Sequence, residues 1–368
     1  MTSLRYQRLL DLMHANGADC AVINPGATLT YLTGLHFHLM ERPTLLICKA
    51  GQQPVLVLPA LELGKANSSL LPLKTFSFGD DPAAWPGVIQ LALNSLSLEK
   101  GKVLVEPTRL RFMEIDFVQK AAPGLQFVNG DAVFNNLRLQ KDAGEIKAMR
   151  KAVEIAQTAL AATLPVLRPG ITEIEVASHL TIEMLKGGSA TELPFQPIVA
   201  AGPNSANPHA VPTDRKLQNG DLVVIDWGAA YEDYYSDLTR TFAIGSISDE
   251  LRRVYNTVKA ANEAGRKAGQ PEVEAGDVDR AARQVIEAAG YGAYFTHRTG
   301  HGLGMEAHEP PYMFGANTLP LNLGMVYTVE PGIYLPGVGG VRIEDNIVVT
   351  AQGCESLSDF PRELQILS

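Results

Sequence analysis

The sequence predicts an α+β protein of two domains, a smaller α/β domain over residues 1–132 followed by a larger domain over residues 133–368. The chain holds 368 residues, and a domain commonly holds roughly 150. Helical and strand patterns alternate in the first third of the chain, as in α/β folds, whereas separate runs of strands and of helices follow, as in α+β folds. With 46% hydrophobic and 19% charged residues, the composition suits a chain with a substantial core.

The first domain is expected to alternate short helices and strands. Its apolar residues recur at helical spacing or in short runs bounded by turn residues. These patterns predict helices over residues 4–14 and 111–120 and strands over residues 21–23, 44–47, 55–58 and 102–105. The two middle strands would form a hairpin that turns at residues 50–53.

The second domain begins with two helices that carry start signals. Asp142 with Glu145, and Thr172 with Glu175, have the pattern of capping boxes. Strand patterns and two further helical patterns follow. The expected helices span residues 142–167, 172–187, 249–269 and 277–289, and the expected strands begin with residues 221–231 and 234–245.

The charge balance excludes some classes of partner. Thirty-one Lys+Arg against 40 Asp+Glu give a formal net charge of −9, whereas binding to nucleic acid or anionic lipid needs clustered positive charge. We find neither the apolar core of a signal peptide nor a run of about 18 apolar residues. The three cysteines, Cys20, Cys48 and Cys354, have no metal-binding or disulfide spacing. We therefore expect a cytoplasmic protein that binds neither nucleic acid nor membranes.

Two aspartates of the second domain form the first candidate site. Strand-like segments flank the polar turn Glu232-Asp233, the pattern of a hairpin. We expect this hairpin to place Asp226 directly opposite Asp237, with their Cβ atoms roughly 4.5–5.5 Å apart. Two ionised carboxylates that close, in apolar surroundings, require a proton or a cation between them.

Two glutamates repeat this arrangement near the C-terminus. Glu330 and Glu344 are symmetric about Gly337, which would centre the loop of another hairpin. Pro331 interrupts a regular ladder of backbone hydrogen bonds, so this register is less firmly specified. The alternative is that both glutamates are ordinary solvated strand residues, but a second carboxylate pair favours a shared site.

Histidines gather between the two hairpins. Of eight histidines, His297, His301 and His308 fall within residues 296–311, and His209 precedes the first hairpin. Glycines on both sides of His301 let the backbone crowd a ligand-bearing imidazole. A histidine is more commonly an ordinary core or surface residue, which is the interpretation that suits His14, His36, His38 and His179.

Together these side chains predict a metal centre. Four carboxylates and one imidazole are too many ligands for one catalytic zinc ion. They suit two divalent ions that share bridging carboxylates and a water whose pKa both ions lower for hydrolysis. Oxygen-rich coordination favours Mn²⁺, with Co²⁺ or Zn²⁺ as alternatives. The candidate ligands are Asp226, Asp237, His301, Glu330 and Glu344.

These motifs resemble the two-domain "pita-bread" metallopeptidases: prolidase (Xaa-Pro dipeptidase), aminopeptidase P, methionine aminopeptidase and the creatinase relatives. The resemblance spans residues 140–368 and, more weakly, the N-terminal domain. It implies a peptidase with a pita-bread catalytic domain preceded by a creatinase-like N-terminal domain. The motifs, in the family's order, are Ile-Asp226-Trp-Gly, Ser-Asp237-Leu-Thr-Arg, Gly-His301-Gly-Leu-Gly…His308-Glu-Pro, Val-Glu330-Pro-Gly-Ile-Tyr and Arg342-Ile-Glu344-Asp.

The resemblance implies a role for each ligand. Asp226 would be the bidentate ligand of one ion. Asp237 and Glu344 would be the bridging carboxylates. His301 and Glu330 would bind the other ion, and Glu330 would also take the proton from the bridging water.

Further residues would serve the substrate. By the same resemblance, His308 would stabilise the tetrahedral intermediate or shuttle a proton, and His209 would contact the substrate near its prolyl end. Arg342 would hold the carboxylates of the site, and Thr239 would hydrogen-bond Asp237.

Within the family, the short N-terminal domain and the total length favour prolidase, which cleaves Xaa-Pro dipeptides, over aminopeptidase P, which shortens longer Xaa-Pro peptides. Some prolidases grip the substrate carboxylate with an arginine shortly after the second motif histidine, but Tyr312 lies in that region here. Arg42 is a candidate to replace it by reaching the active site of a partner in an expected homodimer. Alternatively, Arg42 is a surface arginine paired with Glu41.

Two alternatives come from other functional classes. A creatinase-like amidinohydrolase shares the fold but replaces the metal ligands, and an inactive binding module on the same fold also loses them. All five ligand positions are retained here, and clustered carboxylates without a cation would cost stability. Both alternatives are therefore disfavoured.

Overall fold

The computed structural model describes residues 2–368, and the chain divides into two compact units, the first ending at Arg138 and the second spanning Leu139–Ser368. The division falls after residue 138 rather than after residue 132, because helix α6 (Asp131–Arg138) belongs to the first unit. This helix contacts α1 (Thr2–Ala15) and buries three apolar side chains, Val133, Phe134 and Leu137.

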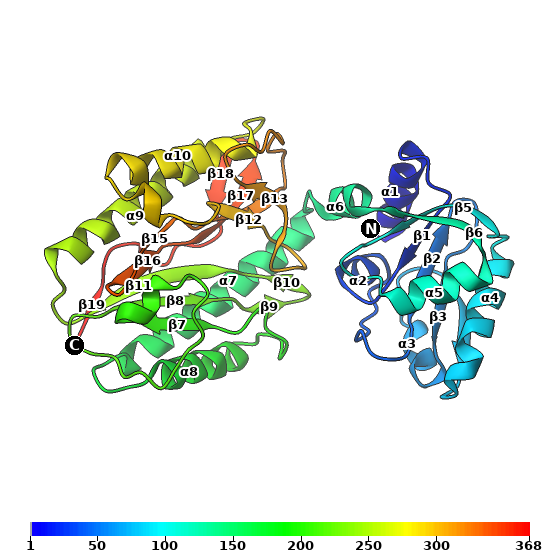
Figure 1. Ribbon diagram of the computed structural model, residues 1–368, viewed down its shortest axis with the longest axis horizontal. Coiled ribbons are helices and arrows are strands. Elements are labelled where there is room, and N and C mark those ends of the chain that lie inside the picture. Colours follow the sequence, from blue (N-terminus) through cyan, green and yellow to red (C-terminus); the bar gives the residue numbers. More distant parts are fainter. Residues whose placement is uncertain (1) are drawn as a thin grey trace. The chain divides into compact units, whose positions relative to one another are not determined.

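The first unit is an α/β domain with one six-stranded sheet. Its strands are β1 (Cys20–Ile23), β2 (Leu45–Lys49), β3 (Val55–Pro59), β4 (Lys74–Phe78), β5 (Lys100–Val105) and β6 (Gly124–Asn129). They lie in the order β4-β3-β2-β1-β5-β6. The remaining helices are α2 (Ala27–Thr33), α3 (Leu63–Ala66), α4 (Trp85–Ser95) and α5 (Phe112–Ala121). Helices α4 and α5 pack on one face, whereas α1 contacts α2 and α6 on the other side of the sheet (Figure 1).

The predicted elements of this domain are confirmed. The expected hairpin consists of β2 and β3, which pair antiparallel with Leu46 opposite Leu56. Burial is complete along both strands apart from Lys49, which is half-buried. Side chains on both faces of these strands are therefore covered, as expected for a sheet with helices on both sides.

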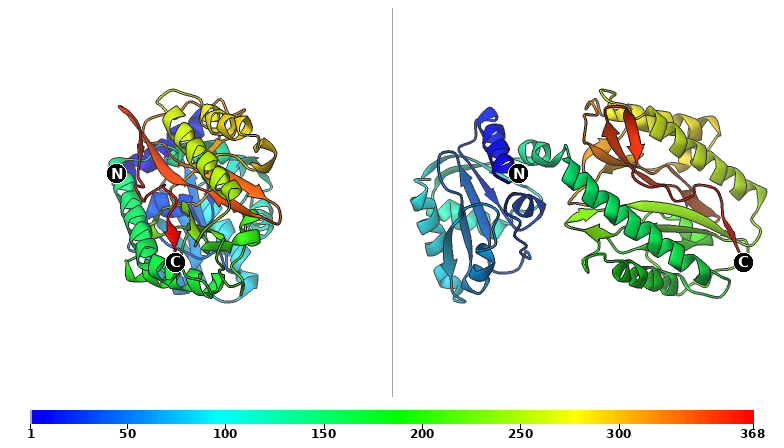
Figure 2. Two further views of the ribbon diagram at one scale, coloured as in Figure 1. Left: turned by 90° about the vertical axis from the view of Figure 1, so that its left-hand side faces the viewer. Right: turned by 180° about the vertical axis from the view of Figure 1, so that it is seen from behind.

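The second unit is the expected α+β domain, with two outer pairs of helices and sheets between them (Figures 1 and 2). One pair is α7 (Ala143–Thr163) with α8 (Glu173–Lys186), and the other is α9 (Asp249–Ala268) with α10 (Ala275–Ala288). This layered arrangement is the pita-bread architecture.

Three sheets of the second unit carry or support the site. The first contains β7 (Ile198–Ala201), β8 (Leu222–Trp227), β11 (Leu238–Ile244) and β19 (Ile366–Leu367), in the order β19-β11-β8-β7. The second contains β12 (Gly300–Gly302), β13 (Glu309–Met313), β14 (Val326–Val329), β17 (Asp345–Thr350) and β18 (Gly353–Ser356), in the order β13-β12-β14-β17-β18. A two-stranded sheet pairs β15 (Gly332–Leu335) with β16 (Gly339–Arg342), and β9 (Ala230–Tyr231) pairs with β10 (Tyr234–Tyr235).

Both predicted capping boxes are confirmed. Asp142 accepts hydrogen bonds from the backbone N–H groups of Gly144 and Glu145, and the Glu145 side chain accepts from the Asp142 N–H. Thr172 and Glu175 exchange the same pair of bonds. Helix α7 ends at Thr163 rather than near residue 167, because a short 3₁₀ turn (Leu164–Val166) follows it.

No helix within residues 2–368 has the length and apolar character required to cross a bilayer.

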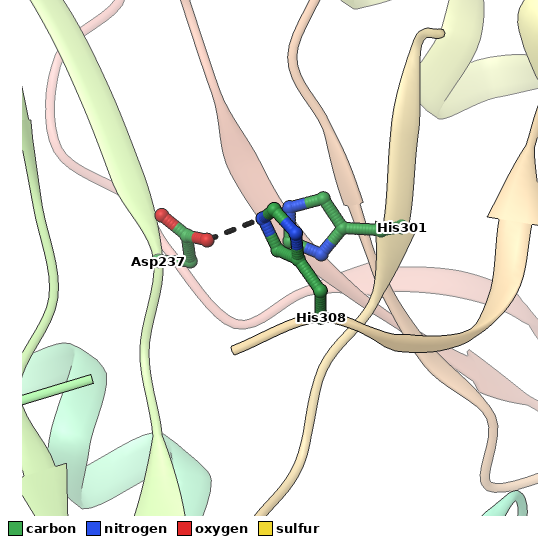
Figure 3. Close-up of side chains that lie close together, drawn as sticks. All are labelled: Asp237, His301 and His308. Carbon is green, nitrogen blue, oxygen red and sulfur yellow. Dashed lines mark ion pairs between the residues drawn. The ribbon is translucent and has the colours of Figure 1, made fainter. Parts of the chain in front are cut away.

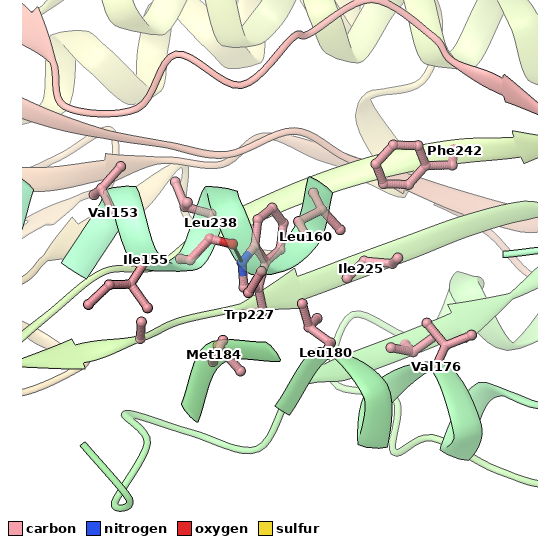
Figure 4. Close-up of a cluster of buried hydrophobic side chains, with 14 of the residues drawn as sticks. Val153, Ile155, Leu160, Val176, Leu180, Met184, Ile225, Trp227, Leu238 and Phe242 are labelled. Carbon is pink, nitrogen blue, oxygen red and sulfur yellow. Dashed lines mark hydrogen bonds between the residues drawn. The ribbon is translucent and has the colours of Figure 1, made fainter. Parts of the chain in front are cut away.

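Trp227 anchors the strand that carries Asp226. Its side chain is fully buried among apolar residues of α7, α8 and β11, as Figure 4 shows. The indole Nε1 donates a hydrogen bond to the carbonyl oxygen of Ala156 at 2.8 Å, so its one polar group is satisfied. This packing fixes β8 and therefore the position of the adjacent carboxylate.

Candidate metal centre

The hairpin that carries the two aspartates has a different register from the one expected. Strands β8 and β11 place Asp226 opposite Thr239, not opposite Asp237. The turn lies at Glu232 and Asp233 as expected, and both have positive φ, 47° and 69°, as in two-residue hairpin turns. A turn centred there pairs Asp226 with Thr239, whereas Asp237 opposite Asp226 would require a turn centred one residue earlier. The prediction of directly opposed aspartates was wrong, and the two residues are diagonal neighbours instead.

The hairpin that carries the two glutamates has the expected register. Strands β15 and β16 are paired symmetrically about Gly337, which has a φ of 75°. Strands β14 and β17 continue the same register on the far side of Pro331. Glu330 and Glu344 lie between the β14–β17 ladder and the β15–β16 ladder, so Pro331 interrupts the hydrogen bonding without shifting the pairing.

His301 lies on β12, where the chain is closely packed on both sides. A Cβ atom at Gly300 would lie 1.9 Å from a carbonyl oxygen of β14, and one at Gly302 would lie 2.1 Å from a carbonyl oxygen of β13. Only glycine fits at either position. The His301 Nδ1 atom lies 3.0 Å from the Gly302 carbonyl oxygen, so Nδ1 carries a proton and donates it to this carbonyl group. The other ring nitrogen, Nε2, lies 3.3 Å from Glu330 Oε1 and 3.6 Å from Asp237 Oδ2.

The structure brings all five predicted ligands into one cluster. Their ligand atoms fall into overlapping groups in which all atoms lie within 4.8 Å of one another. Figure 3 shows the group that also contains His308, with the carboxylate facing the two imidazoles. The groups are Asp226–Asp237–Glu344, His301–Glu330–Glu344 and Asp237–His301–His308.

Asp226 indicates that this cluster fits metal ions. Its Oδ2 accepts a hydrogen bond from Arg342 Nη2 at 2.6 Å. Its Oδ1 is buried and meets no hydrogen-bond donor within residues 2–368. A buried carboxylate oxygen without a partner is costly, and a cation would satisfy it. The donor set of four carboxylates and one imidazole matches a pair of divalent ions better than any single ion.

The ionisation of the cluster is strongly perturbed. Burial, followed by the charge of Glu344, raises the pKa of Asp237 well above its usual range. Burial, followed by the charge of Glu330, does the same to the pKa of Glu344. Burial also opposes the ionisation of Glu330, but the hydrogen bond and charge of His301 outweigh it and lower the pKa of Glu330 to about 2. Bound cations would displace the protons that the metal-free cluster retains.

Arg342 holds the site together as expected, from a fully buried position on β16. Besides Asp226, its guanidinium donates to Thr239 Oγ1 at 3.1 Å and to Tyr334 OH at 2.8 Å. The Thr239 hydroxyl in turn donates to Glu344 Oε2 at 2.7 Å. The expectation that Thr239 bonds Asp237 was therefore wrong, because Thr239 pairs with Glu344 in an isolated antiparallel bridge, which brings its hydroxyl to the Glu344 carboxylate.

Several supporting residues were missed by the sequence reasoning. Tyr334 links Arg342 to His297 through hydrogen bonds: its hydroxyl accepts from Arg342 and lies 2.9 Å from His297 Nε2. His297 Nδ1 in turn lies 2.7 Å from the Arg298 carbonyl oxygen. Asn346 fixes the backbone of Asp237 by bonding both its N–H and its carbonyl group.

Asp279 is a further missed residue, and the sequence did carry a signal for it. The carboxylate is buried on α10 and accepts hydrogen bonds from the N–H and hydroxyl of Thr299, two residues before His301. At helical spacing it falls on the apolar face of α10, among Ala275, Val278 and Ala282. A carboxylate on an apolar helix face requires a partner, which marks it as structurally important.

His308 and His209 both lie at exposed positions of the second unit. The rings of His308 and His301 pack with centroids 4.0 Å apart at 48°. Neighbouring groups remove part of the water around the His308 ring, and this desolvation, followed by the charge of His301, lowers the pKa of His308 to about 4. His209 lies on the segment between β7 and β8, next to Pro208, whose carbonyl oxygen accepts from Arg342 Nη1 at 3.3 Å.

The two remaining candidates occupy different units. Tyr312 lies on β13 directly opposite His301, with the guanidinium of Arg298 over its ring at 4.3 Å from the centroid. Arg42 belongs to the first unit, where it forms ion pairs with Glu41 at 2.9 Å and with Asp80 at 3.0 Å. The pair with Glu41 is the arrangement foreseen for a surface arginine.

Fold and site together define a metal-dependent hydrolase, and comparison with known proteins specifies its family. The model of metallopeptidase family M24 matches residues 147–351, and the Creatinase/Prolidase N-terminal domain matches residues 5–140. The chain therefore belongs to metallopeptidase family M24, is a peptidase, and carries a creatinase-type N-terminal domain. Use of divalent metal follows from membership of this family.

Similar solved structures include dipeptidases and enzymes that act at proline. A dipeptidase from Pyrococcus horikoshii is 37% identical, with a TM-score of 0.93 over 99% of this chain and 100% of that one. A prolidase from Thermococcus sibiricus is 33% identical, with a TM-score of 0.94 over 100% and 99%. An X-Pro aminopeptidase from Thermotoga maritima is 32% identical, with a TM-score of 0.87 over 98% and 99%.

Proposed function

We propose that the protein hydrolyses the imide bond of Xaa-Pro dipeptides, using two divalent metal ions, with Mn²⁺ favoured. The observation that carries the proposal is the cluster of four carboxylates and one imidazole, together with the unsatisfied Oδ1 of Asp226. The ions would be held by the predicted ligands Asp226, Asp237, His301, Glu330 and Glu344. Bound there, they would supply Lewis acidity, lowering the pKa of a water and polarising the substrate carbonyl.

The chain's own side chains supply the remaining steps. Glu330 would receive the proton of the attacking water at its carboxylate. His308 is neutral near pH 7 because its pKa is lowered to about 4, so its imidazole can donate a hydrogen bond to the substrate carbonyl oxygen as negative charge develops there. Arg342 would keep the carboxylates oriented, and His209 would contact the prolyl end of the substrate.

A peptidase of this design suits bonds before proline. The imide nitrogen carries no N–H and the ring fixes φ, so an enzyme that recognises its substrate through the N–H of the scissile bond handles such bonds badly. The site proposed here requires no such donor, because binding depends on the ends of a small peptide. The likeness to a dipeptidase and a prolidase supports a dipeptide as the substrate.

Aminopeptidase P activity on longer Xaa-Pro peptides is the second candidate. The likeness to an X-Pro aminopeptidase over 98% of this chain favours it. The two activities share the same metal centre and differ in what lies beyond the prolyl residue: a free carboxylate in a dipeptide, or a continuing chain.

One comparison of substrates tests the proposal. Protein supplied with Mn²⁺ would be assayed with an Xaa-Pro dipeptide, an Xaa-Pro tripeptide and a Met-Ala peptide, with Asp237→Ala as the inactive control. We expect cleavage of the dipeptide above all. Faster cleavage of the tripeptide would favour aminopeptidase P, cleavage of Met-Ala alone would favour a methionine aminopeptidase, and no cleavage of either proline substrate would refute the proposal.

We also propose a homodimer in a reducing, cytoplasmic setting. The free thiols of the three cysteines, of which Cys20 and Cys48 are buried, are consistent with a reducing compartment. Exposed apolar side chains of the first unit, among them Leu39, Met40 and Leu61, offer surface that a second copy would cover. Sedimentation equilibrium measures the assembly, and a monomer at micromolar concentration would contradict it.

A further inference from the structure

Arg298 is a half-buried arginine whose charge has no partner carboxylate. Its guanidinium carbon lies 4.3 Å from the centroid of the Tyr312 ring. In the part of the chain that the structure describes, residues 2–368, no hydrogen bond or ion pair engages this guanidinium. The two fully buried arginines of the same domain differ in this respect, since Arg240 pairs with Asp345 at 2.9 Å and Arg342 with Asp226 at 2.6 Å.

An uncompensated guanidinium in a partly buried position is costly. Partial burial removes water from the charge, and stacking on an aromatic ring returns only part of the lost hydration energy. The five N–H donors of a guanidinium form a planar fork suited to a carboxylate. The Arg298 guanidinium is therefore suited to bind an anion, specifically a planar anion with two oxygen atoms.

The position of Arg298 is fixed next to the metal cluster. Its carbonyl oxygen lies 2.7 Å from His297 Nδ1, and the next residue, Thr299, is bonded to the buried carboxylate of Asp279. The ring on which it rests, that of Tyr312, belongs to the residue directly opposite His301 in the β12–β13 pair. Directly opposed side chains lie on the same face, roughly 4.5–5.5 Å apart at Cβ, so the Tyr312 ring shares a face with the His301 imidazole, and the Arg298 guanidinium lies over that ring.

We propose that Arg298, supported by the Tyr312 ring, binds the C-terminal carboxylate of the dipeptide substrate. The proposal rests on the proposed function, because that function places a free carboxylate one residue beyond the bond to be cleaved. It also assigns a use to Tyr312, which supplies the surface on which the guanidinium lies. Arg42 is less suited to this task because Glu41 and Asp80 already compensate its charge.

Pairs of substrates that differ only in the carboxylate test the assignment. Xaa-Pro and its amide, Xaa-prolinamide, would be compared at saturating Mn²⁺ with the wild type, Arg298→Ala, Arg298→Lys and Arg42→Ala. The exposed Arg252 of α9 provides the matched control variant, Arg252→Ala. A charge-assisted hydrogen bond commonly accounts for about 10- to 100-fold in binding.

We expect Arg298→Ala to raise KM for the acid about 10- to 100-fold while leaving KM for the amide within about twofold. Arg298→Lys should restore part of the preference for the acid, because it keeps the charge but loses the fork. Arg252→Ala and Arg42→Ala should both keep the wild-type preference. The melting temperature and bound metal of each variant establish that the site is intact, and the conservative Arg298→Gln serves if Arg298→Ala does not fold.

The outcomes separate this proposal from the one it rests on. An unchanged ratio of acid to amide in Arg298→Ala, with normal metal content, would overturn the role of Arg298 but leave the proposed activity standing. Loss of the preference in Arg42→Ala instead would transfer the role to that residue. A wild type that cleaves neither proline substrate would overturn both proposals together.

Discussion

Replacing Lys141 by Met should destabilise the second domain strongly. The Lys141 Nζ atom lies 2.6 Å from Glu309 Oε1, and the two side chains are only 1% and 4% exposed. Removing the lysine would break this ion pair from one side and take its ammonium group away from a buried carboxylate. Breaking a buried ion pair from one side commonly costs about 3–5 kcal/mol, which corresponds to a fall of roughly 10 °C in melting temperature for a domain of this size.

The effect of burial can be isolated with a matched pair. Lys120 and Asp116 lie at nearly the same separation, 2.7 Å, but their side chains are 71% and 33% exposed. Lys120→Met should therefore cost less than about 1 kcal/mol. Urea denaturation followed by tryptophan fluorescence and circular dichroism would measure both variants, with attention to separate transitions of the two domains.

A double variant completes the test. Lys141→Met/Glu309→Gln removes both charges of the pair, so much of the lost stability should return, and the two changes should be strongly non-additive. A cost for Lys141→Met as small as that for Lys120→Met would show that burial does not control the energy of this pair. Because Glu309 follows His308 directly, Lys141→Met should also lower kcat.

Three further predictions concern the site itself. Asp237→Ala or Glu344→Ala should abolish peptidase activity and reduce bound metal, measured by elemental analysis; full metal content with either change would contradict their assignment as ligands. His308→Ala should lower kcat about 100-fold or more while leaving metal content unchanged, and an unaltered kcat would remove His308 from the mechanism. The metal-free protein should lose stability as pH rises: the raised pKa values of Asp237 and Glu344 stabilise the fold fully below the ordinary carboxyl pKa of roughly 4, and this contribution disappears as pH passes the raised values. Added Mn²⁺ should therefore raise the melting temperature more at pH 8 than at pH 5, and an equal rise at both would contradict this origin of the stabilisation.

Local signals predicted the elements, and which candidate ligands would cluster, well because these signals depend on neighbouring residues. The capping boxes at Asp142 and Thr172 lie within one helical turn. The register of the second hairpin follows from a single symmetric loop at Gly337. The turn of the first hairpin was placed correctly at Glu232 and Asp233, but the pairing expected from it was wrong by one register step, because pairing symmetric about these two residues puts Thr239 opposite Asp226.

The residues that support the ligands could not be predicted in the same way. Asn346 bonds the backbone of Asp237 across 109 positions of sequence, and Lys141 bonds Glu309 across 168. Contacts at that separation depend on how layers of secondary structure stack, which no short pattern specifies. The structural role of Asp279 could have been predicted from the sequence, because a carboxylate on an apolar helix face indicates a buried partner.

Simultaneous titration of metal and activity tests the central claim most directly. Protein freed of metal with a chelator would be titrated with Mn²⁺ while bound metal and hydrolysis of an Xaa-Pro dipeptide are measured together. We predict no activity without metal, an increase that saturates at two ions per chain, and loss of both binding and activity in Asp237→Ala. Full activity in the metal-free protein, or saturation of both binding and activity at a single ion per chain, would contradict a dinuclear centre built from these five side chains.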